Sequence, residues 1–363
     1  MATATKTWAI LGGGNGGQAL AGHLSIMGHN TRLYDIIPAT VEAVNAQKGV
    51  TLTGAVEGFG SVEFATMDIA KALDGADYVM VTVTSLAHAT LARQCAPLLK
   101  DGQHVFVHPG ASLGALEFYR IIRNEGCKAD IIVSETNSLI YSARSLKPGS
   151  SHIYGIKSDL QMGCIPSDRT KEAEAIIQTC FKQIRGVHNI IESSLTNSNA
   201  VMHPAASLLS TSYIESGKTW YYYKDAFTPT TGKFTENLDK ERLAIAKAYG
   251  LELESILQWY KTAYGVDAKT VDEAANINPK YEGIEGPNTI MTRFIREDVP
   301  HSLVPMVALA RLKGIKTPYM DVVIELGYLL LGRENFPPAR DMASFGFEGI
   351  TAAEFERYVK EGK

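Results

Sequence analysis

The sequence contains few cysteines, and their arrangement excludes two kinds of stabilised domain. The chain has 4 cysteines in 363 residues, and they show neither a CxxC pair nor the spacing of a zinc finger. They are Cys95, Cys127, Cys164 and Cys180. A disulfide framework or a structural zinc site requires clustered cysteines. We therefore expect neither structural disulfides nor a bound metal.

Long apolar runs and long basic runs are also absent. The longest apolar runs, such as Tyr78–Val83 and Leu326–Leu331, are far too short to span a bilayer. The N-terminal residues MATATKTW lack the apolar core of a signal peptide. A net charge of -4 without a basic cluster argues against nucleic acid or an anionic membrane as the main partner. We therefore expect a globular, cytosolic protein that acts on small molecules.

Glycine is concentrated in a stretch near the N-terminus that has the pattern of a phosphate-binding loop. A short apolar run leads into Gly12, Gly14 and Gly17, which fit GxGxxG, and an amphipathic segment follows. This order predicts a strand, a tight turn and a helix whose N-terminus binds a pyrophosphate. The first glycine permits the turn, the second admits the pyrophosphate, and the third lets helix and strand pack closely. The residues expected to contact a dinucleotide are Gly12, Gly14, Asn15, Gly16 and Gly17.

An acidic residue follows this loop at the distance that a ribose requires. The next apolar run ends at Asp35, 18 positions after Gly17, about where an acid bonds the ribose hydroxyls. Asp35 would repel a 2′-phosphate, and Ile36 and Ile37 supply no cation beside it. We therefore predict NAD as the cofactor. Arg32 lies close enough in the sequence to leave NADP open.

Apolar segments alternate with helical ones up to about residue 191, which predicts a doubly wound parallel sheet. Strands are expected at residues 62–65, 78–83, 104–107 and 131–134, with 152–156 and 187–191 as extensions of the sheet. Thr82 and Thr84 fall near a strand end, where such sheets bind ligands, so we include them as cofactor contacts. An ordinary loop role is the alternative for both. The sequence thus predicts a dinucleotide-binding Rossmann domain over residues 1–191.

Helical patterns dominate after Glu192. Helices are expected at residues 238–249, 253–264, 289–296, 302–313 and 319–331, and a capping box of Thr351 and Glu354 begins a last one. We predict an all-α substrate-binding and catalytic domain over residues 192–363. The fold class is therefore α/β, a doubly wound Rossmann domain followed by a helical domain.

Two motifs in the helical half contain residues that could carry chemistry. A nicotinamide supplies hydride, so the protein must manage protons and substrate charge. In NSNAVMHP, Asn199 and His203 lie on one helical face, and Pro204 favours a helix break that leaves His203 at an N-terminal junction. In TRFIREDVP, Arg293 and Asp298 precede a proline. A structural histidine and a solvated charged turn are the respective alternatives.

Six segments form a recognisable set, in the same order along most of the chain. They are GGGNGG at 12–17, PGASLGALE at 109–117, ETNSLIYSAR at 135–144, NAVMHP at 199–204, LDKERLAIAKAYG at 238–250 and EDVP at 297–300. Together they resemble the opine dehydrogenases, a family that includes octopine, nopaline and N-(1-carboxyethyl)norvaline dehydrogenases. The resemblance implies a Rossmann domain, a helical domain, and the NAD(P)H-dependent reductive condensation of a 2-oxo acid with the amine of an amino acid.

The resemblance also implies roles for particular residues. In that family a histidine of the HP motif and an aspartate of the EDVP motif form a dyad, which implies that His203 and Asp298 are catalytic. An arginine five residues before that aspartate contacts substrate, which implies the same role for Arg293. Asn199 and Arg144 lie in the shared motifs and are the further candidates for substrate binding.

Several alternatives stay open. Ile140 stands where members often carry proline and Ala143 where some carry cysteine, so the preferred amino acid and 2-oxo acid are undetermined. The aromatic run at 220–223 fits either the amino-acid pocket or the core of the helical domain. A 2-oxo acid or glycerol-phosphate reductase would commonly place a lysine near the nicotinamide, where this chain offers His203. A nonenzymatic dinucleotide sensor is the other rival, and homodimer formation is also open.

Overall fold

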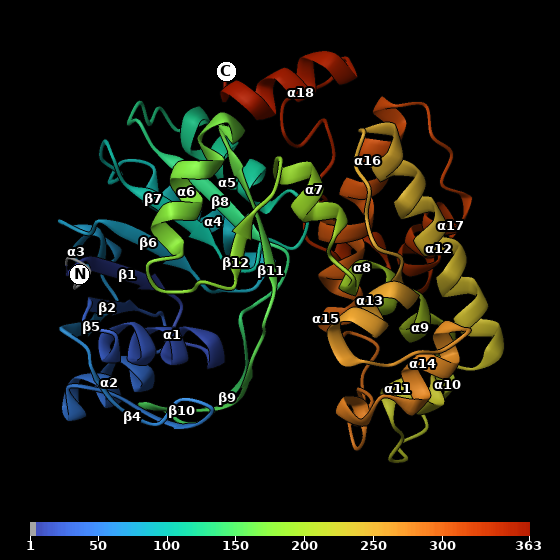
Figure 1. Ribbon diagram of the computed structural model, residues 1–363, viewed down its shortest axis with the longest axis horizontal. Coiled ribbons are helices and arrows are strands. Elements are labelled where there is room, and N and C mark those ends of the chain that lie inside the picture. The colour runs from blue at the N-terminus through green and yellow to red at the C-terminus, as the bar shows by residue number, and fades with distance from the viewer. Residues whose placement is uncertain (1–4) are drawn as a thin grey trace. The chain divides into compact units, whose positions relative to one another are not determined.

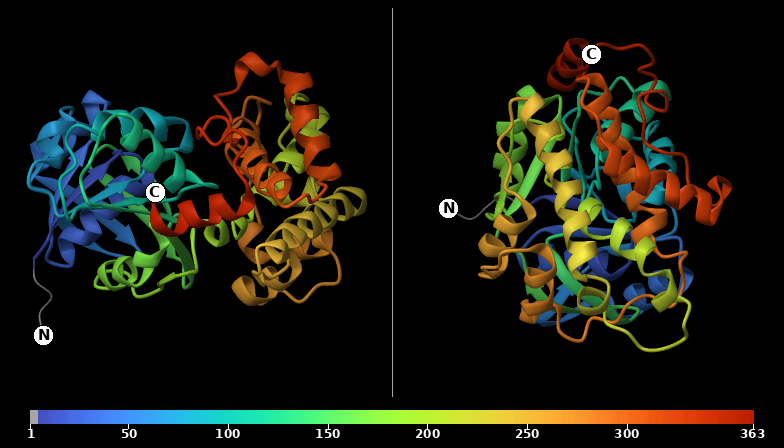
Figure 2. Two further views of the ribbon diagram at one scale, coloured as in Figure 1. Left: turned by 90° about the horizontal axis from the view of Figure 1, so that it is seen from above. Right: turned by 90° about the vertical axis from the view of Figure 1, so that its right-hand side faces the viewer.

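The computed structural model describes residues 5–363, which fold as two units. The first unit is the chain up to Ser193 together with Glu354–Lys363, and the second is Ser194–Ala353 (Figures 1 and 2). The border thus lies two residues after the expected one. Residues 1–4, with which the expected first domain begins, lie outside the described residues.

The C-terminal helix α18 (Ala352–Glu361) belongs largely to the first unit, which corrects its assignment to the helical domain. Its apolar residues Phe355 and Val359 are buried. Arg120 of the first unit donates a hydrogen bond to the hydroxyl of Tyr358. The amphipathic pattern of the helix was visible in the sequence, but the sheet domain against which it packs is more than 150 residues away along the chain.

The first unit is built on an eight-stranded sheet with the order β12-β11-β8-β7-β6-β1-β2-β5 (Figure 1). Neighbouring strands are parallel, except that β11 is antiparallel to β8. The strands are β1 (Thr7–Leu11), β2 (Asn30–Tyr34), β5 (Phe64–Thr66), β6 (Tyr78–Val81), β7 (His104–Val107), β8 (Ile132–Thr136), β11 (Leu160–Ile165) and β12 (Ile184–Gly186). The order from β5 to β8 is that of a doubly wound dinucleotide-binding fold, so the predicted Rossmann domain is confirmed.

Helices follow the strands as expected for a sheet covered on both faces. The central strands β6 and β7 are almost entirely buried, which explains their unbroken apolar sequence. The helices of this unit are α1 (Asn15–Ile26), α2 (Pro38–Gln47), α3 (Ile69–Leu73), α4 (His88–Cys95), α5 (Gly114–Asn124), α6 (Thr170–Ile177) and, across the border, α7 (Ile190–Leu195). Short 3-10 turns η1 (Ser85–Ala87) and η2 (Ser167–Arg169) precede α4 and α6. The expected strand at 187–191 is therefore wrong, because helix α7 begins within it.

A second, four-stranded sheet packs against α1 and was not predicted. Its order is β4-β3-β10-β9, formed by β3 (Gly49–Gly54), β4 (Gly58–Ser61), β9 (Tyr141–Lys147) and β10 (Ser150–Ile156). Gly60 approaches the backbone of Gly22 in α1 so closely that a Cβ at Gly60 would lie 2.2 Å from the Gly22 carbonyl oxygen. The expected strand at 152–156 thus exists, but it belongs to this sheet. Its glycine-, serine- and threonine-rich sequence gave no continuous apolar signal.

The second unit is helical, as predicted. Its helices are α8 (Asn199–Met202), α9 (Pro204–Leu209), α10 (Thr211–Ile214), α11 (Tyr222–Asp225), α12 (Pro229–Ala248), α13 (Ile256–Tyr264), α14 (Val271–Ile277), α15 (Arg293–Arg296), α16 (Val304–Leu312) and α17 (Pro318–Leu331). Short turns are η3 (Pro279–Tyr281), the π-turn η4 (Val299–Leu303) and η5 (Arg333–Asn335). Helix α12 begins well before the expected residue 238, because the Thr228 side chain caps it and Pro229 occupies its first turn.

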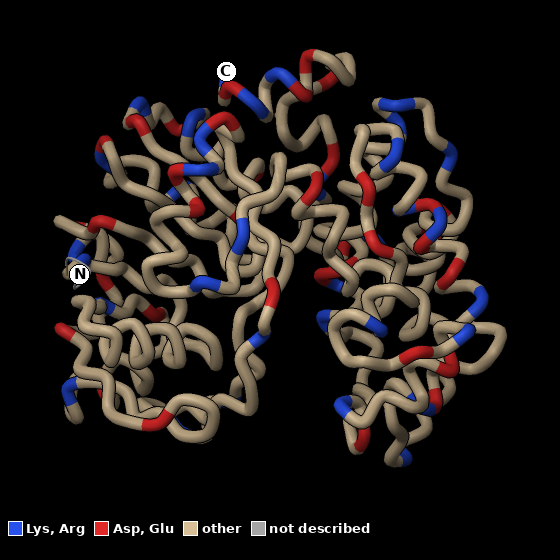
Figure 3. Tube along the Cα trace, viewed as in Figure 1, with Lys and Arg blue, Asp and Glu red and all other residues tan. Residues whose placement is uncertain are grey.

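Charge is mixed in both units. Lysine and arginine residues are interspersed with aspartate and glutamate residues in each unit (Figure 3). Among residues 5–363, none of the helices is long and apolar enough to cross a membrane.

Candidate active site

The glycine-rich loop has the geometry that its sequence predicts. Gly12 adopts a φ of +112°, which side-chain-bearing residues rarely reach, and thereby turns the chain out of β1. A Cβ at Gly17 would lie 1.7 Å from the carbonyl oxygen of Gly12, so only glycine lets α1 pack this closely on the loop. The Thr82 hydroxyl donates to the carbonyl oxygens of Leu11 and Gly12 and so supports the turn. The first and third glycines are therefore required by the fold itself.

Gly14 differs because no contact among residues 5–363 requires a glycine there. It is the N-cap of α1, and an added Cβ would meet no described atom within 4 Å. Within residues 5–363, no side chain caps this helix N-terminus. The first-turn N–H groups and the helix dipole therefore remain directed at a place where a pyrophosphate can approach the backbone. This cradle fits a dinucleotide.

Asp35 follows the last residue of β2 and lies beside the glycine-rich loop. Its buried carboxylate accepts the backbone N–H groups of Gly13 and Ile37, which connects the loop to the next turn. A carboxylate has further acceptor positions, so these bonds are compatible with a ribose hydroxyl. Arg32, which left NADP open, forms a 2.8 Å ion pair with Glu63. That pairing favours NAD.

Two other predicted cofactor contacts occupy different surroundings. The Asn15 side-chain oxygen accepts the backbone N–H of Ser145 in β9, so the side chain joins α1 to the second sheet. Thr84 is exposed at the start of η1. Contact of Asn15 and Thr84 with a dinucleotide stays a prediction.

In the helical unit, His203 and Asp298 form a buried hydrogen-bonded pair. Nδ1 of His203 lies 2.9 Å from Oδ2 of Asp298, and both side chains are at most 10% exposed. Helix α8 ends at Met202 and α9 begins at Pro204, so the predicted helix break at His203 is confirmed. The carboxylate accepts a hydrogen bond from Nδ1, so Nε2 is the imidazole nitrogen that can give or accept a proton.

Aromatic residues hold the imidazole in place. The Phe294 ring stacks on His203 with 4.2 Å between centroids. The buried Tyr222 hydroxyl donates to the carbonyl oxygen of His203 and bonds the hydroxyl of Ser207. Burial raises the pKa of Tyr222 well above its ordinary value, so this phenol keeps its proton. Part of the aromatic run 220–223 therefore supports the histidine from within the core.

The two arginines of the TRFIRED segment have different environments. Arg293 is exposed, with its guanidinium carbon 5.7 Å from the centre of the Phe294 ring that stacks on His203. Arg296 donates from Nε to the carbonyl oxygen of Asn335 and so has a structural partner. This contrast supports Arg293 as the substrate-binding arginine.

Asn199 and Arg144 are both exposed and lie in different units. Asn199 begins α8, one turn before His203, and Arg144 lies on β9 of the second sheet. Sequence reasoning missed Asn197 and Ser302, which are buried beside the dyad and hydrogen-bonded to each other. The available signal was their position, since Asn197 lies in the NSNAVMHP segment and Ser302 follows Asp298 by one turn.

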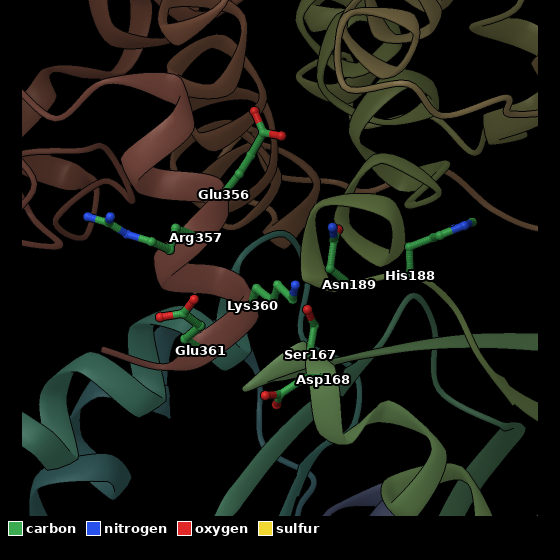
Figure 4. A pocket seen from close by; sticks show the side chains of 8 residues that line it. All are labelled: Ser167, Asp168, His188, Asn189, Glu356, Arg357, Lys360 and Glu361. Atoms are coloured by element: carbon green, nitrogen blue, oxygen red, sulfur yellow. The ribbon is translucent and has the colours of Figure 1, made fainter.

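A surface cavity of about 560 Å³ lies in the first unit. Lys360 of α18 points toward Ser167 of η2 and Asn189 before α7, whereas Arg357 of the same helix points away from them (Figure 4). The cavity is lined by Ser167, Asp168, His188, Asn189, Glu356, Arg357, Lys360 and Glu361. None of these side chains belongs to the candidate active site.

Comparison with known proteins identifies the family. Residues 186–331 match the family described as NAD/NADP octopine/nopaline dehydrogenase, alpha-helical domain. An opine dehydrogenase of Arthrobacter sp. (strain 1C) is 36% identical over 350 residues, which cover 96% of this chain and 97% of that protein. The chain belongs to the opine dehydrogenase family. It is an NAD(P)-dependent oxidoreductase of the class that acts on CH–NH donors, and its reaction is the reductive condensation of an amino acid with a 2-oxo acid.

More distant opine dehydrogenases show the same similarity along the whole chain. A vitopine synthase of Allorhizobium ampelinum is 26% identical, with 94% of this chain and 95% of that protein covered. A structure of octopine dehydrogenase in complex with NADH and agmatine has the same fold, with a TM-score of 0.80 at 20% identity and coverage of 99% and 98% of the two chains. The similarity therefore extends over both units.

The first unit also resembles the glycerol-phosphate reductases that were considered above as an alternative, and this resemblance has a physical explanation. Residues 7–122 match the N-terminus of NAD-dependent glycerol-3-phosphate dehydrogenases. That match ends within the Rossmann sheet, where the residues form a dinucleotide site common to many reductases. The helical unit contains His203 and Asp298, and it is the unit that matches the octopine/nopaline family. The second half of the chain therefore distinguishes this family from other reductases that share the dinucleotide-binding domain.

Proposed function

We propose that His203 and Asp298 form the proton-transfer pair of this opine-forming reaction. The main support is the 2.9 Å contact between Nδ1 of His203 and Oδ2 of Asp298, both of which are buried. The carboxylate fixes the imidazole tautomer and stabilises its charged form, so Nε2 can give and accept a proton. Since Nε2 can both give and accept a proton, such a pair suits reaction in both directions.

The condensation places two demands on the protein. The amine of the amino acid attacks the carbonyl carbon of the 2-oxo acid, water leaves, and the resulting imine takes up a hydride and a proton to give a secondary amine. The nicotinamide, when bound, supplies the hydride. We assign the proton to His203 and the 2-oxo acid carboxylate to Arg293, whose guanidinium can bind it in a bidentate manner.

Mutation of the pair tests this assignment. Pyruvate, NADH and each standard amino acid are assayed for NADH oxidation, and variants are then measured with the best amino acid. We expect His203→Ala to lower kcat by roughly 10²- to 10⁴-fold, the usual contribution of a positioned acid or base. Asp298→Asn is expected to lose a large part of the same factor. The double variant should be little worse than the poorer single variant, because the two residues act as a unit.

The controls distinguish catalysis from helix stabilisation. NADH affinity and melting temperature are measured for all three variants, and both should stay close to the parent values. A lower melting temperature with normal specific activity of the folded fraction would show that the pair only stabilises its helix junction. Penalties that multiply in the double variant would also contradict the proposal.

For the cofactor, we propose a preference for NADH over NADPH. The support is the carboxylate of Asp35 at the end of β2 and the engagement of Arg32 by Glu63. A 2′-phosphate near Asp35 would meet like charge without a free cation beside it. We expect kcat/KM for NADH to exceed that for NADPH, and Asp35→Asn to reduce the ratio. A parent enzyme that uses NADPH equally well would contradict the assignment, and Arg32→Ala is the matched control, expected to leave the ratio unchanged.

Two copies of the chain are proposed to associate through α17. Its outer face exposes Val322, Leu329 and Leu330 by 55%, 74% and 52%, an apolar surface that a stable partner would cover. In an antiparallel two-fold pairing, Asp321 in the first half of one helix approaches Arg333 beyond the end of the other. Sedimentation should give twice the mass of one chain, and Leu329→Glu should give the mass of one. Parent enzyme that sediments as a single chain would refute this pairing.

The state of the thiols supports a reducing compartment. Cys95, Cys127, Cys164 and Cys180 are free cysteines, and the first three are buried. Thiols in this state are typical of cytosolic enzymes. A cytosolic location is accordingly part of the proposal, and fractionation of the source cells tests it.

A further inference from the structure

Two more buried side chains are joined by hydrogen bonds to the His203–Asp298 pair. Nδ2 of Asn197 donates to Oγ of Ser302 across 3.1 Å. Oγ of Ser302 in turn donates to Oδ1 of Asp298 across 3.4 Å. Asn197 is 3% exposed and Ser302 is completely buried. A chain of hydrogen bonds thus runs from Asn197 through Ser302 and Asp298 to His203, and all four residues belong to the helical unit.

Elementary chemistry fixes the direction of this chain. The side-chain amide nitrogen of Asn197 can only donate, and the carboxylate of Asp298 can only accept. Ser302 has one hydroxyl proton, so a hydroxyl that accepts from the amide directs its proton to the carboxylate. Each carboxylate oxygen of Asp298 then has its own donor, Ser302 at Oδ1 and His203 at Oδ2.

The orientation of the Asn197 amide is determined independently. Its Oδ1 accepts the backbone N–H of Asn199 across 3.1 Å at the start of α8. This bond requires the carbonyl end of the amide to face α8, which leaves the NH₂ group to face Ser302. The segment that carries His203 is thereby connected to the segment that carries Asp298, although the two lie 95 positions apart in the sequence.

The backbone around Ser302 is unusual in the same place. Asp298 immediately precedes the π-turn η4, and Ser302 lies within it, four residues later. A π-turn, with hydrogen bonds from residue i to i+5, is rare and is frequently found at functional sites. Here it brings the hydroxyl of Ser302 to the carboxylate of Asp298, and all five residues of the turn are buried.

We propose that Asn197 and Ser302 are positioning residues of the reaction, which hold the Asp298 carboxylate so that its second oxygen meets Nδ1 of His203. The inference rests on the proposed role of the dyad and deepens it. Neither residue needs to contact substrate. Without the Ser302 donor, the carboxylate loses one of its two fixed bonds and can rotate about its Cβ–Cγ bond, so the imidazole is held less firmly.

Four variants test this role, with pyruvate, NADH and the best amino acid as the probe. Ser302→Ala should lower kcat by about 10-fold, the scale of one hydrogen bond to a charged group, with both KM values and NADH affinity unchanged. Ser302→Thr keeps the hydroxyl and should restore most of kcat. Asn197→Asp keeps the acceptor for the Asn199 N–H but draws the Ser302 proton away from Asp298, so it should resemble Ser302→Ala. Ser210→Ala, a buried serine at the end of α9, is the control and should leave kcat unchanged.

The Asp298→Asn background separates failure of this inference from failure of the dyad. If Ser302 acts through Asp298, adding Ser302→Ala to Asp298→Asn should cause no further loss of kcat. Normal kcat in Ser302→Ala and Asn197→Asp, with Asp298→Asn impaired, would overturn the positioning role and leave the dyad intact. Full activity of Asp298→Asn would overturn both. A loss that multiplies in the double variant, or that follows melting temperature alone, would assign Ser302 to stability and overturn the inference as well.

Discussion

The candidate site residues of the two units are held in different ways. In the first unit, the dinucleotide cradle consists largely of backbone, formed by glycines, a helix N-terminus and one acid within residues 12–35. In the second unit, the proposed site consists of side chains that are distant in sequence, such as the hydrogen-bonded pair of His203 and Asp298. A local backbone site tolerates little change in its glycines, whereas a side-chain site depends on single functional groups.

The largest expected effect distinguishes two glycines of the first unit. Gly17→Ala places a Cβ 1.7 Å from the Gly12 carbonyl oxygen, and we expect a loss of stability on the order of 4 kcal/mol or more because the obstacle is backbone. Gly14→Ala meets open space and should cost about 1 kcal/mol or less. Gly14→Ala should nevertheless weaken NADH binding at least about 10-fold, since its Cβ enters the phosphate cradle.

Chemical denaturation and NADH titration measure these two losses. Fluorescence of Trp8 reports on the first unit, and Trp220 with Trp259 reports on the second. A Gly17→Ala protein with parent stability, or a Gly14→Ala protein with parent NADH affinity, would show that the cradle is not built as described.

A smaller effect should distinguish two arginines of the second unit, Arg293 and Arg296. Arg293→Ala should raise the KM for pyruvate by about 30-fold or more at an unchanged melting temperature, because it removes a charge-assisted pair worth roughly 2 kcal/mol or more. Arg296→Ala should instead lower the melting temperature, because its Nε donates to the Asn335 carbonyl oxygen. The reverse pattern, with KM raised only in Arg296→Ala, would exchange the two assignments.

The difference between local features and features formed by distant segments also explains which parts of the structure the sequence could predict. The Rossmann unit was predictable because GxGxxG, its flanking strand and Asp35 act over a short span, where spacing and periodicity are informative. The second sheet was missed because its strands are short and rich in glycine, serine and threonine, and because β3 pairs with β10 about 100 residues later. The place of α18 was missed because packing between distant segments determines it.

In the helical unit, resemblance to a family identified His203 and Asp298, whereas spacing alone left a structural histidine as an alternative. Asn199 attracted attention because it shares a helical face with His203, but it is exposed. Asn197, two residues earlier, is the buried amide that connects to the dyad through Ser302. Helical periodicity could not show this, because Asn197 precedes α8 and Ser302 lies in a π-turn.

The smallest expected effect concerns acid stability, in which the units also differ. Burial lowers the pKa of His104 and His108 in the first unit to about 3, and that of His301 in the second unit to about 3. Burial also lowers the pKa of His23 and of His29 in the first unit. A histidine whose pKa is lower in the folded protein takes up its proton only on unfolding. Its stability contribution is therefore complete above about pH 6.5 and falls as the pH drops from about 6.5 towards 3.

Between pH 7 and 5.5, each histidine whose pKa lies near 3 should remove about 1 kcal/mol of unfolding free energy. The first unit, with two histidines near 3 and two more shifted in the same direction, should lose at least about 2 kcal/mol, and the second unit about 1 kcal/mol. Urea unfolding at both pH values measures the two losses in the full chain. Trp8 is followed in a variant with Trp220→Phe and Trp259→Phe, and Trp220 with Trp259 in a Trp8→Phe variant. His104→Phe, which keeps a ring to stack on Phe106, should reduce the loss in the first unit by about 1 kcal/mol. Equal acid sensitivity of the two units, or an unchanged loss in His104→Phe, would mean that these buried histidines do not determine the difference.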